Sequence, residues 1–109
     1  MRAGELDRRI DIQQAVISKN ALNESVSQWI SLGTVWAKKT DVSDGERMRA
    51  AEVSAQITTR FLIRWSIAMS VVNPKDRVIF GGRTYDIFFV KEIGRREGIE
   101  ISAAARADK

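Results

Sequence analysis

The amino-terminal third of the chain contains two stretches in which apolar and polar residues alternate. In residues 8–16, Ile10, Ile12 and Val16 alternate with polar neighbours, the period of two that is typical of a half-buried strand. A second strand is expected over residues 29–41, where Gly33 predicts a bulge or a bend. The polar residues 18–28 predict an exposed loop or a hairpin tip between the two strands.

The carboxy-terminal half alternates more regularly. Phe61, Ile63, Trp65 and Ile67 share one side of a predicted strand at residues 60–67. Further on, residues 77–80 and 84–90 flank a Gly-Gly pair, which predicts an antiparallel hairpin because both turn positions tolerate a positive φ. A last short strand is expected at residues 99–103.

Between these halves the spacing of apolar residues becomes helical. Ser43 and Glu46 match a capping box, and Met48 and Ala51 follow at helical intervals, which predicts a short helix over residues 43–54. The apolar face of this helix is poor, so it would bury little surface in a monomer. We therefore expect one short helix or a long loop, at about residues 41–57, inserted between strands.

Together the patterns predict a mainly β protein with a small antiparallel β-barrel of about six strands. Closure into a barrel is expected because it hides the strand edges that would otherwise template aggregation. The chain has no internal repeat, no low-complexity tract and one proline, Pro74, so residues 1–109 are expected to form a single domain.

The residue types that are missing narrow the possible chemistry. The 109 residues include no Cys and no His, which excludes a cysteine nucleophile, a Ser-His-Asp triad and a structural zinc site of the usual kind. We therefore expect no enzymatic activity, no catalytic residue, no cofactor and no bound metal.

The charged amino terminus and the lack of a long apolar stretch predict neither a signal peptide nor a membrane span. The net charge of +4 permits contact with nucleic acid without requiring it.

The densest acidic cluster is Asp41, Asp44 and Glu46, followed by Arg47 and Arg49. Paired carboxylates can serve glycoside hydrolysis or a magnesium site, but capping and the helix dipole also favour acidic residues at a helix start. On a helix the arginines would form i,i+3 pairs with the two acidic residues at 44 and 46. A solvated face and a contact with an adjacent subunit both remain open for this cluster.

Basic and aromatic residues lie close together in the carboxy-terminal half. The alternation places the arginines on the outer face of the strands and the aromatic rings in the core, which argues against the exposed aromatics of a single-strand binder. The residues considered as a possible basic and aromatic face are Arg60, Arg64, Arg77 and Arg83, with Trp65 and Tyr85. The aromatic residues to which we assign structural roles are Trp36, Trp65, Phe61 and Phe89. Gly81-Gly82-Arg83 is too short for a phosphate-binding loop and is assigned to a turn.

Trp29 begins its strand directly after the polar stretch. A Trp in that position is a candidate anchor of a protein interface, and a cap of the core is the alternative.

Four segments of the sequence carry a resemblance to a known family. They are Met1-Arg2-Ala3-Gly4-Glu5-Leu6-Asp7-Arg8-Arg9-Ile10-Asp11-Ile12-Gln13, Trp29 through Trp36-Ala37, Arg60-Phe61-Leu62-Ile63-Arg64-Trp65, and Arg77-Val78-Ile79-Phe80-Gly81-Gly82-Arg83-Thr84-Tyr85-Asp86-Ile87. In this order they resemble the segments of the head-tail joining proteins of long-tailed bacteriophages, also called head closure or head-tail adaptor proteins. The resemblance covers nearly the whole chain, and the last segment is the most specific. Two positions depart from the family pattern, because Trp65 and Phe80 stand where Tyr is usual.

The resemblance implies a structural virion protein that forms a homo-oligomeric ring at the head-tail connector. Such a ring completes the DNA channel, retains the packaged double-stranded DNA and provides the docking surface for the tail, with portal, adaptor and tail proteins as partners. It implies location in the virion and, during assembly, in the host cytoplasm. The inserted segment could then close the channel, with Asp44, Glu46, Arg47 and Arg49 at a subunit interface or facing the channel. A tail completion or terminator ring protein and a monomeric nucleic-acid-binding barrel are the alternatives.

Overall fold

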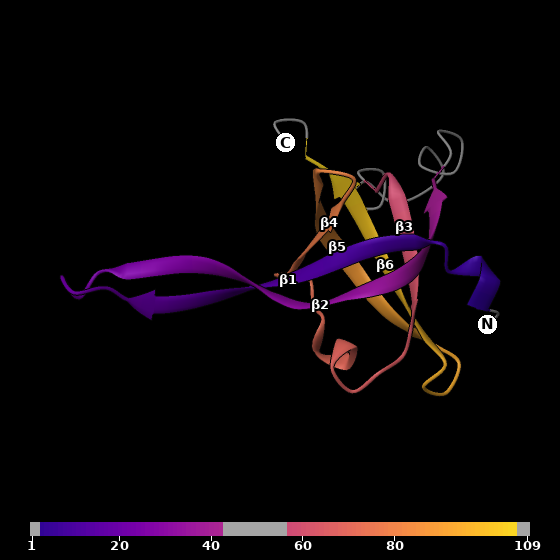
Figure 1. The fold of residues 1–109 in the computed structure, drawn as a ribbon, viewed down its shortest axis with the longest axis horizontal. Coiled ribbons are helices and arrows are strands. Elements are labelled where there is room, and N and C mark those ends of the chain that lie inside the picture. The colour runs from indigo at the N-terminus through magenta and orange to yellow at the C-terminus, as the bar shows by residue number, and fades with distance from the viewer. Residues whose placement is uncertain (1–2, 43–56, 107–109) are drawn as a thin grey trace.

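The computed structural model describes residues 3–42 and 57–106, and in it six antiparallel strands close into a barrel (Figure 1). The order around the barrel is β1-β2-β3-β6-β5-β4. The strands are β1 (Arg8–Lys19), β2 (Ser25–Asp41), β3 (Thr59–Arg64), β4 (Arg77–Phe80), β5 (Arg83–Ile93) and β6 (Gly98–Ala105), with short 3-10 helices η1 (Ala3–Glu5) and η3 (Met69–Val71). The predicted mainly β fold is confirmed. Within the described residues, no helix is long and apolar enough to cross a membrane.

The core of the barrel is built from the inward-facing positions that the alternation predicts. Ile10 and Ile12 of β1 and Ile63 of β3 are completely buried. Phe61, 0% exposed, lies at the centre, where its ring meets the buried Tyr85 ring edge to face with 5.2 Å between centroids. Such a pair stabilises the core by about 0.5–1.5 kcal/mol beyond the burial of its area.

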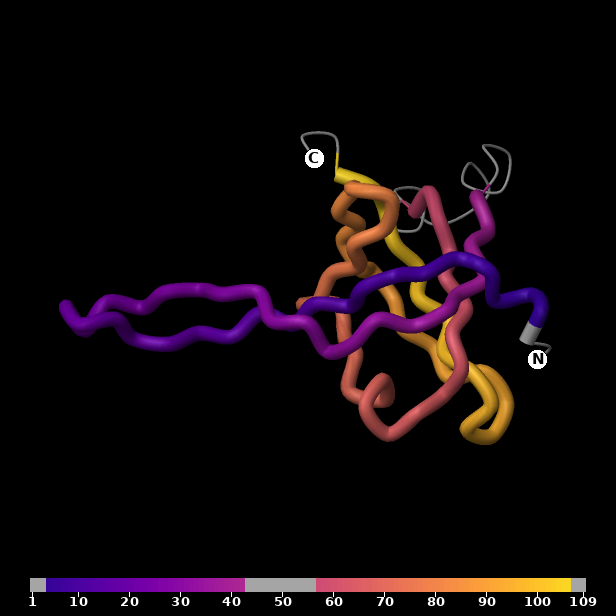
Figure 2. Tube along the Cα trace, in the orientation of Figure 1, coloured from indigo at the N-terminus to yellow at the C-terminus, as the bar shows by residue number. Residues whose placement is uncertain are grey.

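The hairpin of β1 and β2 is longer than predicted. Of the two alternatives for residues 18–28, an exposed loop or a hairpin tip, the structure has the hairpin tip, but Ser18 pairs with Val26 and Lys19 with Ser25, so the turn is confined to residues 20–24. The tube in Figure 2 shows this hairpin extending far beyond the barrel, on the side opposite to η1. The molecule is therefore elongated, measuring 49 × 30 × 25 Å along its principal axes.

The predicted irregularity at Gly33 is confirmed. Ile12 pairs with Gly33 but Gln13 pairs with Ser31, so Leu32 is an extra residue in β2. This bulge lies where the hairpin leaves the barrel, and bulges of this kind bend and twist a strand. Gly33 has φ 157°, and a Cβ there would lie 3.0 Å from the terminal carbon of Met69.

The other predicted turn and strand ends differ only in detail. Gly81 and Gly82 have φ 59° and 77°, as expected for the tight turn between β4 and β5. The predicted strand at residues 60–67 is too long, because β3 ends at Arg64 and Ile67 is exposed. The predicted helix at residues 43–54 lies outside the described residues.

Candidate assembly surface

The part of the hairpin outside the barrel, residues 14–31, is here called the arm. Two of its eighteen residues, Lys19 and Glu24, are charged, whereas charged residues make up 29% of the chain. The core of a protein interface is depleted in charge in the same way. The arm therefore differs in composition from an ordinary solvated face.

Apolar side chains lie on both faces of the arm. Because paired residues share a face, Trp29 and Ile17 lie on one side, and Val16 and Ile30 on the other. All four are exposed. An isolated two-stranded ribbon is at best marginally stable in water, and exposed apolar patches mark contact sites. The arm thus presents two faces that a further protein surface would stabilise.

The tip of the arm is organised by one side chain. The Asn20 Oδ1 atom accepts hydrogen bonds from the backbone N–H groups of Leu22, at 2.9 Å, and Glu24, at 3.0 Å. Asn23 adopts φ 63°, a left-handed conformation that Asn tolerates better than most residues. This turn projects Leu22, 78% exposed, at the apex.

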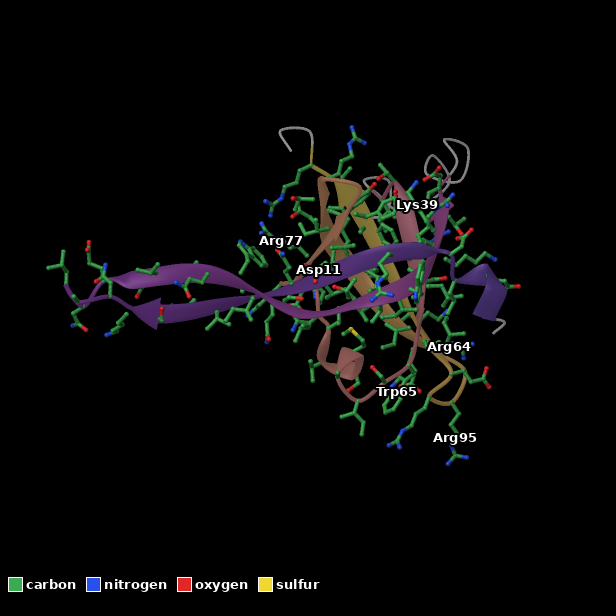
Figure 3. All side chains as sticks on the ribbon, viewed as in Figure 1. Asp11, Lys39, Arg64, Trp65, Arg77 and Arg95 are labelled. Atoms are coloured by element: carbon green, nitrogen blue, oxygen red, sulfur yellow. The ribbon has the colours of Figure 1, made fainter. Side chains whose placement is uncertain are left out.

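The root of the arm is held to the barrel by a small polar network, whose members Asp11 and Arg77 are labelled in Figure 3. The Arg77 Nε atom donates to Gln13 Oε1 at 2.7 Å, and Gln13 Nε2 donates to Asp11 Oδ2 at 3.0 Å. Ser31 Oγ donates to the other Asp11 oxygen at 2.5 Å. The network joins β1, β2 and β4 where the ribbon leaves the barrel.

Trp29, the candidate anchor, belongs to this root. Its ring is 37% exposed, and the guanidinium carbon of Arg77 lies 4.1 Å from the ring centroid. Burial lowers the pKa of the Arg77 guanidinium, and the positive Arg106 nearby acts in the same direction, against the opposing effect of Asp86 and Asp11. The group stays protonated, since an arginine does not lose its proton in proteins, and it therefore covers one face of the indole with a cation.

Two aromatic residues predicted to be structural are exposed instead. Trp36 is 50% exposed, and Phe89 is also exposed, so the prediction that they lie in the core is wrong. The prediction is also incomplete for Trp65, which is only partly buried. Alternation predicts the face of a strand on which a side chain lies, but it does not predict whether another element covers that face. Phe61 and Tyr85 are buried as expected.

A groove of about 700 Å³ opens beside Trp36 and Trp65. It lies next to the point where the pairing of β2 with β3 ends, at Ala37 and Ile63. Arg9 lies 5.0 Å from the Trp36 ring centroid and Arg96 5.1 Å from that of Trp65. The residues that line the groove are Leu6, Thr34, Val35, Trp36, Arg64, Trp65 and Ser66.

The predicted cluster Asp44, Glu46, Arg47 and Arg49 lies outside the described residues. The structure does describe Val42 and Ile57, the residues that flank this segment on either side. Val42 and Ile57 are buried, and the Val42 N–H donates to the Thr58 carbonyl at 2.9 Å. The segment therefore leaves and re-enters the barrel at adjacent points between β2 and β3.

Among residues 3–42 and 57–106, no group of three acidic, His or Cys side chains could hold a metal ion. Within the arm the sequence predicted one site residue, the candidate anchor Trp29. The arm as a whole and the groove were not predicted, although the long run with few charges between Ile12 and Lys38 is a signal that could have drawn attention to them.

Comparison with known proteins places the chain in a family. A model of the family described as phage head completion protein matches residues 1–106. The chain is similar to the solution structure of a protein from Shigella flexneri 2a, with 26% identity, a TM-score of 0.83 and complete coverage of both chains. It is also similar to a chain in the virion of a native gene transfer agent particle, with 25% identity, a TM-score of 0.60, and 90% of this chain and 92% of that chain covered. None of the curated proteins matches significantly. The chain belongs to the phage head completion proteins, which confirms the resemblance of its motifs.

Proposed function

We propose that this protein forms a ring at the head-tail connector of a phage virion, where it completes the DNA channel, retains the packaged DNA and provides the surface on which the tail docks. Its family makes it a structural protein of the bacteriophage virion. Its partners in this proposal are further copies of itself, the portal and adaptor proteins above it, the tail proteins below it and the double-stranded DNA in the channel. It acts in the virion and assembles in the host cytoplasm.

The arm is the observation that carries the proposal. A ribbon with apolar side chains on both faces and two charges in eighteen residues is poorly suited to remain in water. A ring of identical subunits covers such a ribbon by one repeated contact between different surfaces of neighbouring copies. Trp29 is proposed as an anchor of that contact. Iodide quenching of Trp29 fluorescence that stays unchanged on assembly would contradict this role.

The segment between Val42 and Ile57 is proposed to contribute to the ring or to the channel wall. Asp44, Glu46, Arg47 and Arg49 are its charged candidates for a subunit interface or a channel-facing position. The observation that supports this assignment is that Val42 and Ile57, which flank the segment, are buried, with the Val42 N–H donating to the Thr58 carbonyl.

A monomeric nucleic-acid-binding barrel is the second candidate, and the exposed aromatic residues favour it. Trp29, Trp36 and Trp65 each have an arginine over the ring, and such surfaces can bind a phosphate backbone and stack bases. Against it, one face of each indole is already covered by a guanidinium of the same chain. A tail completion or terminator ring is the third alternative, and it shares the need for a repeated contact.

The first experiment measures the mass of the purified protein by light scattering, alone and with DNA-filled capsids that lack tails, followed by electron microscopy of the portal vertex. The proposal predicts a ring at the vertex and particles that accept tails. Binding to tail tubes but not to the vertex would support the tail protein, and salt-sensitive binding of oligonucleotides by a monomer would support the nucleic-acid-binding barrel.

A further inference from the structure

The groove beside Trp36 and Trp65 is suited to receive an apolar group with a negative charge nearby. Its lining combines the apolar Leu6 and Val35 with the two indole rings, and its volume of about 700 Å³ lies in the range of pockets that enclose a whole ligand. No described strand pairs with β2 on the side toward β3 before Ala37, so this part of the surface is also an open strand edge.

Three arginines lie at this apolar lining. Arg9 and Arg96 lie over the two indole rings, and Arg64 lines the groove itself. Figure 3 shows Arg64 and Trp65 at the end of the barrel away from the arm, with Arg95 beyond them. A guanidinium held beside an apolar surface favours a carboxylate partner, because the charge-assisted hydrogen bond forms where water is partly excluded.

The tip of the arm carries the complementary groups. Leu22 projects at the apex, and Glu24 follows it within the turn that Asn20 holds. Lys19 and Glu24 are the only charges on the arm, so little charge must be desolvated when the tip is buried.

The tip and the groove of one molecule cannot meet. Trp36 pairs with Arg9 near the start of β1, whereas the tip follows Lys19 at its end. At about 3.3 Å per residue, the two sites lie roughly 30 Å apart along the same ribbon. A contact between tip and groove would therefore join two copies, and its repetition would be head to tail, the arrangement that generates a ring when the rotation closes.

We propose that the arm tip of one copy, led by Leu22, inserts into the groove between Trp36 and Trp65 of the next copy, with Glu24 facing the arginines of the groove. This inference rests on the proposed ring and identifies the two surfaces that build it. The occupant is the tip of a second copy. It supplies an apolar side chain that fits the apolar lining of the groove and a carboxylate that can pair with the arginines there.

The absence of Cys from the chain gives a direct test. Full-length Leu22→Cys and Thr34→Cys proteins are prepared separately, since both positions are exposed and Thr34 lines the groove. They are mixed in equal amounts, assembled on DNA-filled capsids without tails and oxidised. The inference predicts a disulfide-linked dimer from the mixture, a ladder of linked copies from the Leu22→Cys/Thr34→Cys double variant, and no linkage from either single variant alone. Leu22→Cys mixed with Lys91→Cys, which carries the second thiol on an exposed position of β5, is the matched control.

A second measurement does not depend on disulfide geometry. Leu22→Asp should weaken incorporation into the ring at least tenfold, whereas Leu22→Met should retain it, and both should melt as the unchanged protein does because the tip is exposed. A ring that forms normally without the predicted cross-link and with Leu22→Asp overturns the inference and leaves the ring intact as a function. Linkage of Leu22→Cys to itself or to another virion protein also overturns it. If the unchanged protein forms no ring at the vertex, the proposed function fails and this inference fails with it.

Discussion

The guanidinium of Arg77 stacks on the indole of Trp29, with 4.1 Å between its central carbon and the ring centroid. Arg77 lies on β4 and Trp29 on β2, and these strands are not neighbours in the barrel. The same arginine donates to Gln13 of β1, the strand between them, at 2.7 Å. One side chain thus connects three strands at the root of the arm and sets the direction in which the arm leaves the barrel.

Replacing Arg77 by Ala should loosen the arm without unfolding the barrel. The change removes a cation–π contact and a hydrogen bond, which together stabilise the root by about 1–2 kcal/mol. In a Trp36→Phe/Trp65→Phe background, Trp29 fluorescence should be quenched more strongly by iodide in Arg77→Ala. Arg83→Ala, at an exposed position of β5, serves as the control and should leave the quenching unchanged. Equal quenching in the two variants would show that Arg77 does not cover Trp29 in solution.

Gly33→Ala should destabilise the junction of arm and barrel. The backbone at φ 157° lies outside the conformations that residues with a Cβ readily adopt, and the new Cβ would press on Met69 at 3.0 Å. The expected loss is about 1–3 kcal/mol in the free energy of unfolding, measured by urea denaturation. Gly4→Ala, where nothing lies within 4 Å of the added Cβ, should change stability little. A loss as large at Gly4 as at Gly33 would remove the local explanation.

Asp76 should make the protein less stable as the pH rises above the acid range. Its side chain is 4% exposed, and burial raises the pKa of its carboxyl, although the Asn73 N–H donates to it at 3.0 Å and opposes the shift. The folded state therefore binds the proton more tightly than the unfolded state. Stability from this group is greatest below the unfolded pKa of about 3.9 and falls until the pH passes the folded value.

Asp76→Asn should remove this pH dependence while keeping an acceptor for the Asn73 N–H. The difference in unfolding free energy between Asp76→Asn and the unchanged protein should then grow in favour of the variant from pH 3.5 to pH 6, values chosen to span the ordinary carboxyl range. Lys75→Gln, an exposed neighbour, tests whether any change of charge in this loop has the same effect. Parallel curves for all three proteins would contradict the prediction.

Reversing Arg47 and Arg49 to Glu tests the segment outside the described residues. If these side chains lie at a subunit interface or face the channel, the double variant should lower the yield of infectious particles or lose packaged DNA. Particle counts and DNA content measure the effect. Normal virion yield with retained DNA would end this assignment.

The barrel could be predicted from sequence because each of its strands has one face against a shared core. Ile10, Ile12, Phe61 and Ile63 stand at alternate positions of their strands for that reason, and all four are completely buried. The turn at Gly81-Gly82 was predictable because its backbone needs two positive φ angles.

The arm was not predictable by the same rule. Outside the barrel the ribbon has no buried face, so Val16 and Ile17, or Trp29 and Ile30, stand next to each other instead of alternating. Polar residues such as Ser18 and Ser25 then look like a loop, although cross-strand hydrogen bonds hold them in strands. Trp36 was misassigned because its neighbour Ala37 is the residue that faces the core, so Trp36 lies on the outer face of β2.

The barrel closes through a short seam, and this has a mechanical consequence. Strand β1 pairs with β4 over only Asp11, Ile12 and Gln13, whereas it pairs with β2 along its whole length. A pull on the tip of the arm would load both β1, which is held to β4 at these three residues, and β2, which is held to β3 from Ala37 to Asp41. Because the β1–β4 seam has the fewest residue pairs of the six around the barrel, we expect it to part first under such a load and to open the barrel beside the arm, while the other five seams stay closed.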